Sequence, residues 1–171
     1  MTVQEAIRTR KSIRKYKADP IEPEKLERVM EAGWLAPSAV NRQMWKLIYV
    51  TDKDKIMRLQ DKACYGQKHV GMAPAFIAVC GVEDERLMPC GQYATSLDCS
   101  IAMSFILLAA QEEGLGMCWL GRFDEQPVRD ILNIPDNYRV VAVSPIGYRD
   151  EDPERRPRKD KDTVICHDSF K

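Results

Sequence analysis

Apolar residues recur along the chain at spacings that predict short helices and strands in alternation. A first short helix is expected at residues 3–8. A second begins at Pro23, because proline is favoured in the first turn of a helix, and it ends before Pro37. Charged residues separate apolar ones that return about every 3.6 positions, so one face of this helix should be buried. That face is formed by Leu26, Val29, Met30, Gly33 and Trp34.

Strands are predicted where β-branched and aromatic residues gather, at residues 45–50, 75–82, 116–121 and 139–146. Further helices are expected at residues 53–63, 91–113 and 126–132. This alternation contains no internal repeat and no domain linker. It predicts one α+β domain over residues 1–171, with a sheet that helices flank on both sides.

The longest predicted helix, residues 91–113, carries apolar or small side chains around most of its circumference. Leu97, Ile101, Ser104 and Leu108 form one face, and more small and apolar residues lie beside it. Such a helix should be central and packed on more than one side. One chain of this size would struggle to cover so much apolar surface alone, which favours a homodimer.

Composition is that of an ordinary globular domain, with 44% hydrophobic and 30% charged residues. Basic and acidic residues both number 26, so no basic excess indicates nucleic acid or an acidic membrane surface as a partner. No signal-peptide pattern opens the sequence, and its longest apolar run, residues 105–110, is too short to span a bilayer. We therefore expect a soluble, cytoplasmic protein.

Motifs for metal, nucleotide or nucleophilic chemistry are weak. The six cysteines include no CxxC pair, so we expect buried, reduced thiols and no metal site. Residues 114–116 (Gly-Leu-Gly) precede a strand, and Trp119 stands where a dinucleotide-binding loop needs its third glycine. His69 and His167 have no recognisable triad partner, which predicts structural or surface roles.

Two basic clusters stand near opposite ends of the chain. Residues 9–14 combine three cations with two hydroxyls, and residues 155–159 supply a second cluster. Arginine, lysine and serine together suit a phosphate group, although a solvated basic loop is the alternative interpretation. Eleven of the thirteen residues at 150–162 are charged, so residues 150–171 are predicted to form an exposed arm unless something binds them.

Four separated segments make the sequence resemble the FMN-dependent nitroreductase family over nearly its whole length. They are residues 10–14 (Arg-Lys-Ser-Ile-Arg), 37–45 (Pro-Ser-Ala-Val-Asn-Arg-Gln-Met-Trp), 114–121 and 156–158 (Arg-Pro-Arg). Each is weak alone, but their order and spacing together are specific. The resemblance implies an α+β fold that forms an intertwined homodimer, with one FMN in each of two sites at the subunit interface.

The resemblance also implies residue roles. Arg10, Lys11 and Ser12 would hold the FMN phosphate, and Arg156 and Arg158 would close that site from the C-terminal side. Arg14 would reach the ribityl chain and the pyrimidine edge, where a guanidinium favours the negatively charged reduced flavin. The other implied contacts are Pro37, Ser38, Ala39 and Asn41 in a loop donated by the partner subunit, Gln43 in the same segment, Gln67 beside the flavin ring, and Leu120 and Gly121, whose segment directs a backbone N–H at flavin N5.

The sequence departs from the family pattern in two places. Met44 stands where the family usually has proline, so the end of the 37–45 segment should differ slightly. Only about ten residues separate the strand ending near Val82 from the long helix. Longer family members cover the flavin with extra helices in that region, so we expect a pocket that is open or covered only by a loop.

The activity implied is an FMN-dependent, ping-pong oxidoreductase. NADH or NADPH would give hydride to FMN N5, and a small electron-poor acceptor, such as a nitroaromatic, a quinone or an enone, would then take the electrons. The chemistry lies on the cofactor, so no side chain is predicted as a catalytic acid or base. The alternatives are a protein that stores FMN without turnover and, least favoured at zero net charge, an anion- or nucleic-acid-binding module.

Overall fold

A computed structural model of the protein describes residues 1–83 and 87–170. Strands in these residues form a four-stranded antiparallel sheet in the order β1-β2-β4-β3. They are β1 (Trp45–Val50), β2 (Ala75–Val82), β4 (Tyr138–Tyr148) and β3 (Leu115–Met117). Trp45 pairs with Gly81 across β1 and β2. Ala75 pairs with Ile146 across β2 and β4. The expected α+β fold is confirmed.

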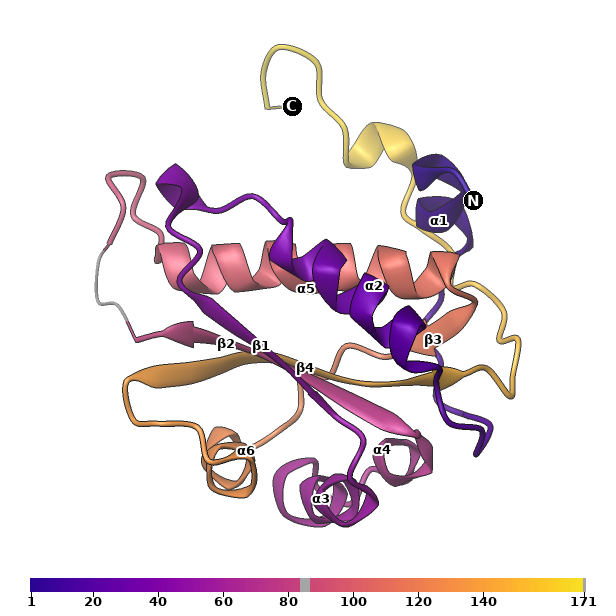
Figure 1. Ribbon diagram of the computed structural model, residues 1–171. Helices are drawn as coiled ribbons and strands as arrows, with labels where there is room; N and C mark the ends of the chain where they lie inside the picture. Colours follow the sequence, from indigo (N-terminus) through magenta and orange to yellow (C-terminus); the bar gives the residue numbers. More distant parts are fainter. Residues whose placement is uncertain (84–86, 171) are drawn as a thin grey trace.

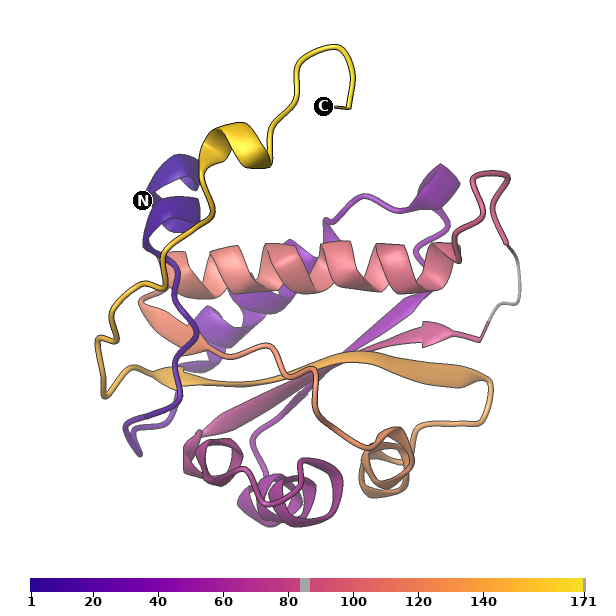
Figure 2. The same ribbon diagram turned by 180° about the vertical axis from the view of Figure 1, so that it is seen from behind.

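Helices cover both faces of the sheet (Figures 1 and 2). On one face lie α2 (Pro23–Trp34) and α5 (Ala94–Glu112), which pack against each other. The other face carries α3 (Lys53–Arg58), the π-helical turn η2 (Leu59–Ala63), α4 (Lys68–Met72) and α6 (Glu125–Leu132). The short helix α1 (Val3–Thr9) packs at the C-terminal end of α5, where Gln111 Nε2 donates to Thr9 Oγ1 over 3.0 Å.

The central strand β2 supplies both layers of the core, because successive side chains on a strand point to opposite faces. Residues 75–81 are all buried. Those facing α2 and α5 are Ala75, Ile77 and Val79. Those facing α3, α4 and α6 are Phe76, Ala78 and Cys80. Burying a side chain the size of Ile77 or Phe76 stabilises the fold by about 1.5–3 kcal/mol. The continuous apolar run in the sequence follows from this two-sided burial.

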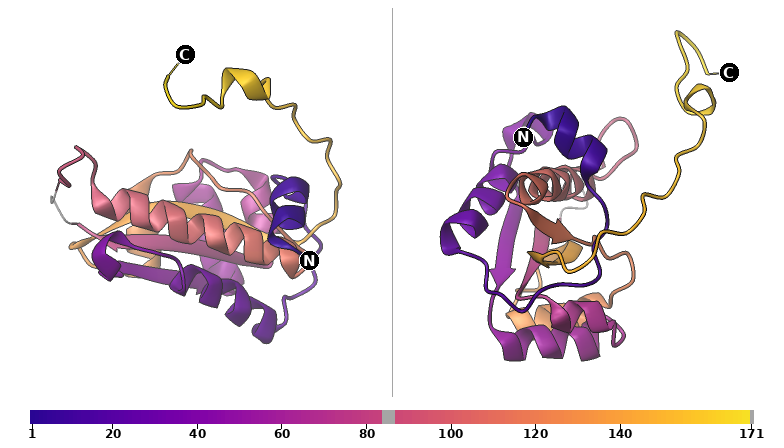
Figure 3. Two further views of the ribbon diagram at one scale, coloured as in Figure 1. Left: turned by 90° about the horizontal axis from the view of Figure 1, so that it is seen from above. Right: turned by 90° about the vertical axis from the view of Figure 1, so that its right-hand side faces the viewer.

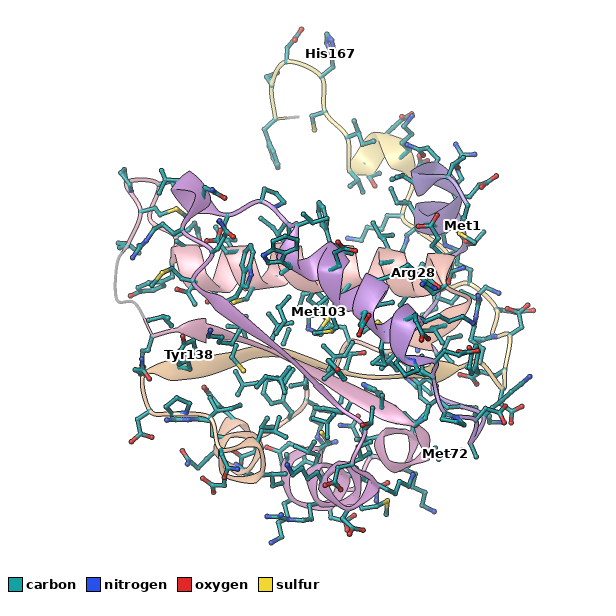
Figure 4. The ribbon with its side chains drawn as sticks, in the orientation of Figure 1. Met1, Arg28, Met72, Met103, Tyr138 and His167 are labelled. Atoms are coloured by element: carbon teal, nitrogen blue, oxygen red, sulfur yellow. The ribbon has the colours of Figure 1, made fainter. Side chains whose placement is uncertain are left out.

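Helix α5 packs against α2, the sheet and α1. Met103 and Ile106 are fully buried, and Figure 4 shows Met103 between α5 and the sheet. A stripe of Leu97, Ile101 and Phe105 stays 43%, 36% and 40% exposed. We call these three residues the apolar stripe. The expected packing on more than one side is thus confirmed for the sheet and α2, while this chain covers the apolar stripe only in part.

Helix α5 is also long and apolar enough to cross a membrane, judged by length and composition alone. Within the described part of the chain it is the one helix that meets this criterion. Its buried face contributes Cys99, Ala102 and Met103 to the core shared with α2 and the sheet. That packing is typical of the core helix of a globular domain.

Several predicted elements differ in detail. Trp34 is 57% exposed and does not join the buried face of α2, because it is the last residue of the helix, where the chain turns away. The helix expected at residues 53–63 is α3 followed by η2. Helix α4 was not predicted because it contains Gly71, a poor helix former. A Cβ at Gly71 would lie 2.4 Å from Gln60 Oε1, so a larger residue there would require the flexible Gln60 side chain to move.

Strand β3 is shorter than the predicted strand 116–121. It pairs with β4 only over Leu115–Met117. The chain then leaves the sheet, where the buried Cys118 N–H donates to Ser144 Oγ over 3.2 Å. Leu120 returns to β4 through a single bridge to Val143. The Ser144 hydroxyl therefore replaces a backbone acceptor in the strand pairing. The apolar pattern of these residues does not predict this replacement.

The residues after β4 leave the body of the molecule (Figure 3). From residue 154 to residue 170 every position is exposed, and a short 3-10 turn, η3 (Lys161–Thr163), is the one regular element described there. Val164, Ile165 and Phe170 are 64%, 61% and 98% exposed. His167 lies far from the sheet in Figure 4. The end of the arm thus carries three large apolar side chains that the described residues leave mostly exposed.

Candidate functional site

The two basic clusters of the sequence meet in space. Their residues line one small cavity of about 120 Å³. The cavity, which we call the basic cavity, is lined by Arg10, Lys11, Ser12, Arg155, Arg156 and Arg158. Its size suits a small anion such as a phosphate group. Five cations around so small a space leave a strong local positive field, although the net charge of the chain is zero.

Helix α1 positions the first half of the basic cavity. Thr2 and Glu5 form a capping box that starts the helix. The Arg10 N–H closes the other end by donating to Ala6 O over 2.9 Å. The chain then runs beside β3, where the Ile13 N–H donates to Met117 O over 3.0 Å. Arg10 to Ser12 are thus held between a capped helix and the edge of the sheet.

The C-terminal half is held by contacts to the same segment. Arg155 Nη1 donates to Arg8 O over 2.5 Å. Lys11 Nζ forms an ion pair of 2.7 Å with Asp152, and this contact lowers the pKa of the Asp152 carboxyl. The pKa of Arg10 is lowered by burial first and then by the charges of Arg158 and Arg155. The cations of the basic cavity therefore oppose one another, and a bound anion would relieve that repulsion.

Arg14 lies just past the basic cavity on a well-fixed backbone. Its N–H donates to Glu151 Oε1 over 2.5 Å, while the guanidinium side is exposed. The neighbouring Ile13 and Tyr16 are buried in a small cluster with Ala73. The Tyr16 hydroxyl donates to Ile13 O over 2.5 Å. This packing fixes the direction of the backbone at Arg14 and leaves its charge free to meet a ligand.

The 37–43 loop has a conformation that costs free energy. Val40, Asn41 and Gln43 adopt positive φ angles of 47°, 56° and 49°. Such conformations cost on the order of 1–3 kcal/mol each, most for a β-branched residue such as Val40. Side chains brace the loop from within: Ser38 Oγ accepts from the Gln43 N–H, and Gln43 Nε2 donates to Asn41 Oδ1, both over 3.0 Å. A strained and braced loop indicates a functional shape.

This loop and the segments that line the basic cavity lie at opposite ends of α5 (Figure 1). The Ala39 N–H donates to Asp98 Oδ1 over 3.0 Å, in the second turn of the helix. Helix α1 meets α5 at Gln111. At about 1.5 Å per residue, the two attachment points are roughly 20 Å apart. The structure therefore does not bring the predicted loop contacts and the predicted phosphate contacts together within one chain.

The remaining candidates lie near each other on the α4 side of the sheet. Gln67 Nε2 donates to Arg122 O over 2.9 Å, which places it beside residues 120–122. The Leu120 N–H donates to Val143 O over 3.0 Å, so it is already used within the sheet. Gly121 is exposed, and a Cβ there would meet nothing within 4 Å. Gly121 is therefore the residue of this pair whose backbone a ligand could approach.

A larger cavity lies elsewhere. It measures about 770 Å³ and runs between α2 and β1. Three carboxylates, Glu24, Glu27 and Glu31, and two cations, Arg28 and Lys46, line it, so it lacks the excess of positive charge found in the basic cavity. In the described residues no group of three histidine, cysteine or acidic side chains could hold a metal ion.

A sequence profile of the Nitroreductase family matches residues 7–90 and 61–148. The chain belongs to the nitroreductase family. It is 35% identical over 168 residues to a protein of Archaeoglobus fulgidus named provisionally as an NADH dehydrogenase/NAD(P)H nitroreductase, covering 96% of this chain and 90% of that protein.

Solved structures agree with this assignment. An FMN-dependent nitroreductase from Clostridium difficile has 31% identity and a TM-score of 0.83, over 98% of this chain and 99% of that one. The NADPH:FMN oxidoreductase of Vibrio harveyi, solved with NAD⁺, has 26% identity and a TM-score of 0.89, over 99% of this chain and 78% of that one. The predicted membership and the nitroreductase fold are confirmed, and the chain is an oxidoreductase enzyme.

Sequence reasoning missed several residues beside the candidate site. Glu151 and Asp152 orient the backbone and the lysine at the N-terminal cluster. Half-buried His69 has an Nε2 without a hydrogen-bond partner among the described residues. Burial lowers the pKa of His69, and the charge of Arg14 lowers it further. Asp98 could have been identified from the sequence, because it is an acidic residue within an apolar helix.

The cysteines only partly match the expectation of buried thiols. Cys64, Cys80, Cys99 and Cys118 are buried, and burial raises the pKa of each of these thiols. Cys90 and Cys166 are exposed, so the expectation is wrong for these two. They lie in loop and arm segments whose sequence has no apolar periodicity to indicate burial. A role for the buried thiols in the chemistry is disfavoured, because the thiolate is the reactive form.

Proposed function

We propose that this nitroreductase binds FMN and transfers electrons from NADH or NADPH to small electron-poor acceptors by a ping-pong mechanism. The basic cavity is the observation that carries the proposal. A flavin phosphate is dianionic, and such a group needs several fixed cations. The names of two relatives, the Clostridium difficile and Vibrio harveyi enzymes, also contain FMN.

The residues present fit the cofactor. Arg10, Lys11, Ser12, Arg156 and Arg158 would bind the phosphate, where the charges of Arg158 and Arg155 already oppose that of Arg10. The exposed guanidinium of Arg14, just outside the cavity, would meet the polar edge of the ring. Gly121 and Gln67 would contact the ring, and the Gly121 backbone is open to close approach because a Cβ there would meet nothing within 4 Å. Bound FMN supplies the hydride-accepting N5.

We further propose that the enzyme is a homodimer and that each flavin site uses both chains. Pro37, Ser38, Ala39, Asn41 and Gln43 lie at the far end of α5 from the basic cavity, so a second copy would have to bring them to it. The apolar stripe on α5 gives that copy a surface to cover. Val164, Ile165 and Phe170 give the arm apolar residues that only another surface could bury.

The proposed order of events follows from a single shared site. NAD(P)H and acceptor would occupy the same face in turn, so each must leave before the other enters. Residues of the chain would orient the flavin and neutralise its charge. Arg14 would balance negative charge near the ring, and the basic cavity would keep the cofactor bound throughout. No described side chain is required to move a proton at the reacting atom.

One anaerobic titration tests the proposal. The purified protein should be yellow, and NADH or NADPH should bleach its long-wavelength flavin band. A nitroaromatic, a quinone or an enone should then restore the colour. A yellow protein that neither nicotinamide bleaches would instead support FMN storage without turnover. A colourless protein whose binding of nucleic acid falls steeply with salt would support the anion-binding alternative.

A further inference from the structure

Asp98 is the one charged side chain among the described residues that is buried, with 7% of its surface exposed. It stands in α5 next to Cys99, which belongs to the core. Burying a carboxylate is costly unless it has a hydrogen-bond partner. Its Oδ1 accepts the Ala39 N–H over 3.0 Å. A function that accounts for this buried carboxylate is to hold the segment that contains Ala39.

That segment is the strained 37–43 loop. The internal bonds of the loop join Ser38 to Gln43 and Gln43 to Asn41, so they fix its shape but do not attach it to the body. The bond from Ala39 to Asp98 does attach it, at the residue directly before Val40, whose φ is 47°. Val40 itself is 86% exposed, so packing does not hold the loop at that point.

We propose that Asp98 is a positioning residue for the flavin site of the partner subunit. By fixing Ala39, it would aim Ser38 and Asn41 at an FMN whose phosphate lies in the basic cavity of the other chain. The inference rests on the proposed function, because it needs a flavin in that cavity. It adds that a buried residue of the central helix, which touches no cofactor, sets flavin affinity in the opposite subunit.

Matched substitutions separate this role from a general effect on folding. Asp98→Ala removes the acceptor, whereas Asp98→Asn keeps an Oδ1 that can accept the Ala39 N–H. Ser100→Ala, on the same helix, is the control because the Ser100 hydroxyl donates to Ser96 O in its own helix and has no other hydrogen bond among the described residues. A hydrogen bond to a charged group corresponds to roughly tenfold to hundredfold in affinity. FMN affinity should fall by that factor in Asp98→Ala, recover most of it in Asp98→Asn, and stay unchanged in Ser100→Ala.

A second variant breaks the same bond from the loop side. Ala39→Pro deletes the N–H donor while Asp98 remains. Proline is favoured at the first position of a helical turn, and Ala39 opens the 3-10 turn Ala39–Asn41. The preceding Ser38 is extended, with φ −137° and ψ 159°, as a residue before proline should be. Ala39→Pro should weaken FMN binding as Asp98→Ala does, so the proposal stays testable even if Asp98→Ala does not fold.

Subunit complementation tests the trans arrangement. Asp98→Ala and Arg10→Ala chains, each with its own affinity tag, are co-expressed and purified through both tags as the heterodimer. One site then combines the intact basic cavity of the first chain with the intact loop of the second, and the other site combines both defects. The heterodimer should bind one FMN tightly, at a flavin concentration at which neither homodimer is loaded.

Each outcome has a definite meaning. If every site in the heterodimer is weak, the loop serves its own subunit and the proposal is wrong. If Asp98→Ala and Ala39→Pro both bind FMN as tightly as the unmodified protein, Asp98 does not position the loop. If the unmodified protein binds no FMN, the proposed function fails first, and this result is distinguishable from the other two.

Discussion

Arg10 and Arg158 line one cavity of about 120 Å³ although they come from opposite ends of the chain. Burial lowers the pKa of Arg10, and the charge of Arg158 is the next largest cause. The segment that carries Arg158 is attached to the N-terminal segment nearby, where Arg155 Nη1 donates to Arg8 O. The arrangement indicates a receptor for an anion.

Removing either cation should weaken FMN binding. A charge-assisted hydrogen bond to a partly buried anion contributes about 1.5–3 kcal/mol. Arg10→Ala and Arg158→Ala should each reduce FMN affinity by roughly tenfold to hundredfold. Because both act on one phosphate, their effects should not add in the double variant. Fluorescence titration with FMN measures this, with Arg58→Ala on exposed α3 as the control. Unchanged affinity in Arg158→Ala would mean that the C-terminal cluster is a solvated arm.

Charging the apolar stripe should separate the subunits. Ile101 is 36% exposed within one chain, so Ile101→Asp should fold, yet it would place a charge in the proposed interface. Sedimentation should show the variant at one chain's mass, 19.6 kDa, with weak FMN binding. Met57→Asp is the control, since Met57 is 39% exposed on α3, on the opposite face. A flavin-loaded species of 19.6 kDa in the unmodified protein would contradict the shared site.

Alkaline pH should destabilise the protein through its buried thiols. Burial raises the pKa of Cys64, Cys80 and Cys99 to about 12. Below the ordinary thiol pKa both states are protonated, and this contribution to stability is complete. As pH rises toward about 12, only the unfolded chain loses the protons, so the free energy of unfolding falls by up to about 1.4 kcal/mol per pH unit for each thiol.

Urea midpoints measured in reductant between about pH 8 and pH 10 would show this slope. Cys99→Ala should reduce the slope, whereas Cys90→Ala, at an exposed position, should leave it unchanged. If the slope is the same in both variants and the unmodified protein, ionisation of the buried Cys99 thiol does not contribute to it.

The main helices and strands could be predicted from the sequence because their causes are local. The two-sided burial of β2 is visible as a continuous apolar run, and the positions of α2 and α5 follow from helical periodicity. Long-range causes were not visible. The Cys118 N–H donates to Ser144 Oγ, which ends β3 early. Gln60 lies against Gly71 where α4 packs. Neither relationship leaves a periodic pattern in either segment.

The candidate site could be predicted from the sequence only in part, for the same reason. Arg10 and Arg158 could be paired through the resemblance to a family, since no local pattern joins residues so far apart. The bond between Asp98 and Ala39 depends on where a loop crosses a helix, which requires the fold. The positive φ of Val40 could not be predicted at all, because a β-branched residue disfavours it.

The phosphate-binding role of the basic cavity is the central claim, and one comparison of ligands tests it most directly. FMN and riboflavin share the same ring and differ by the phosphate. Both are titrated into the flavin-free protein and into the Arg10→Ala/Arg158→Ala double variant. We predict that the unmodified protein binds FMN at least about a hundredfold more tightly than riboflavin, and that the double variant loses most of this preference. Equal affinity for the two flavins in the unmodified protein would contradict the account.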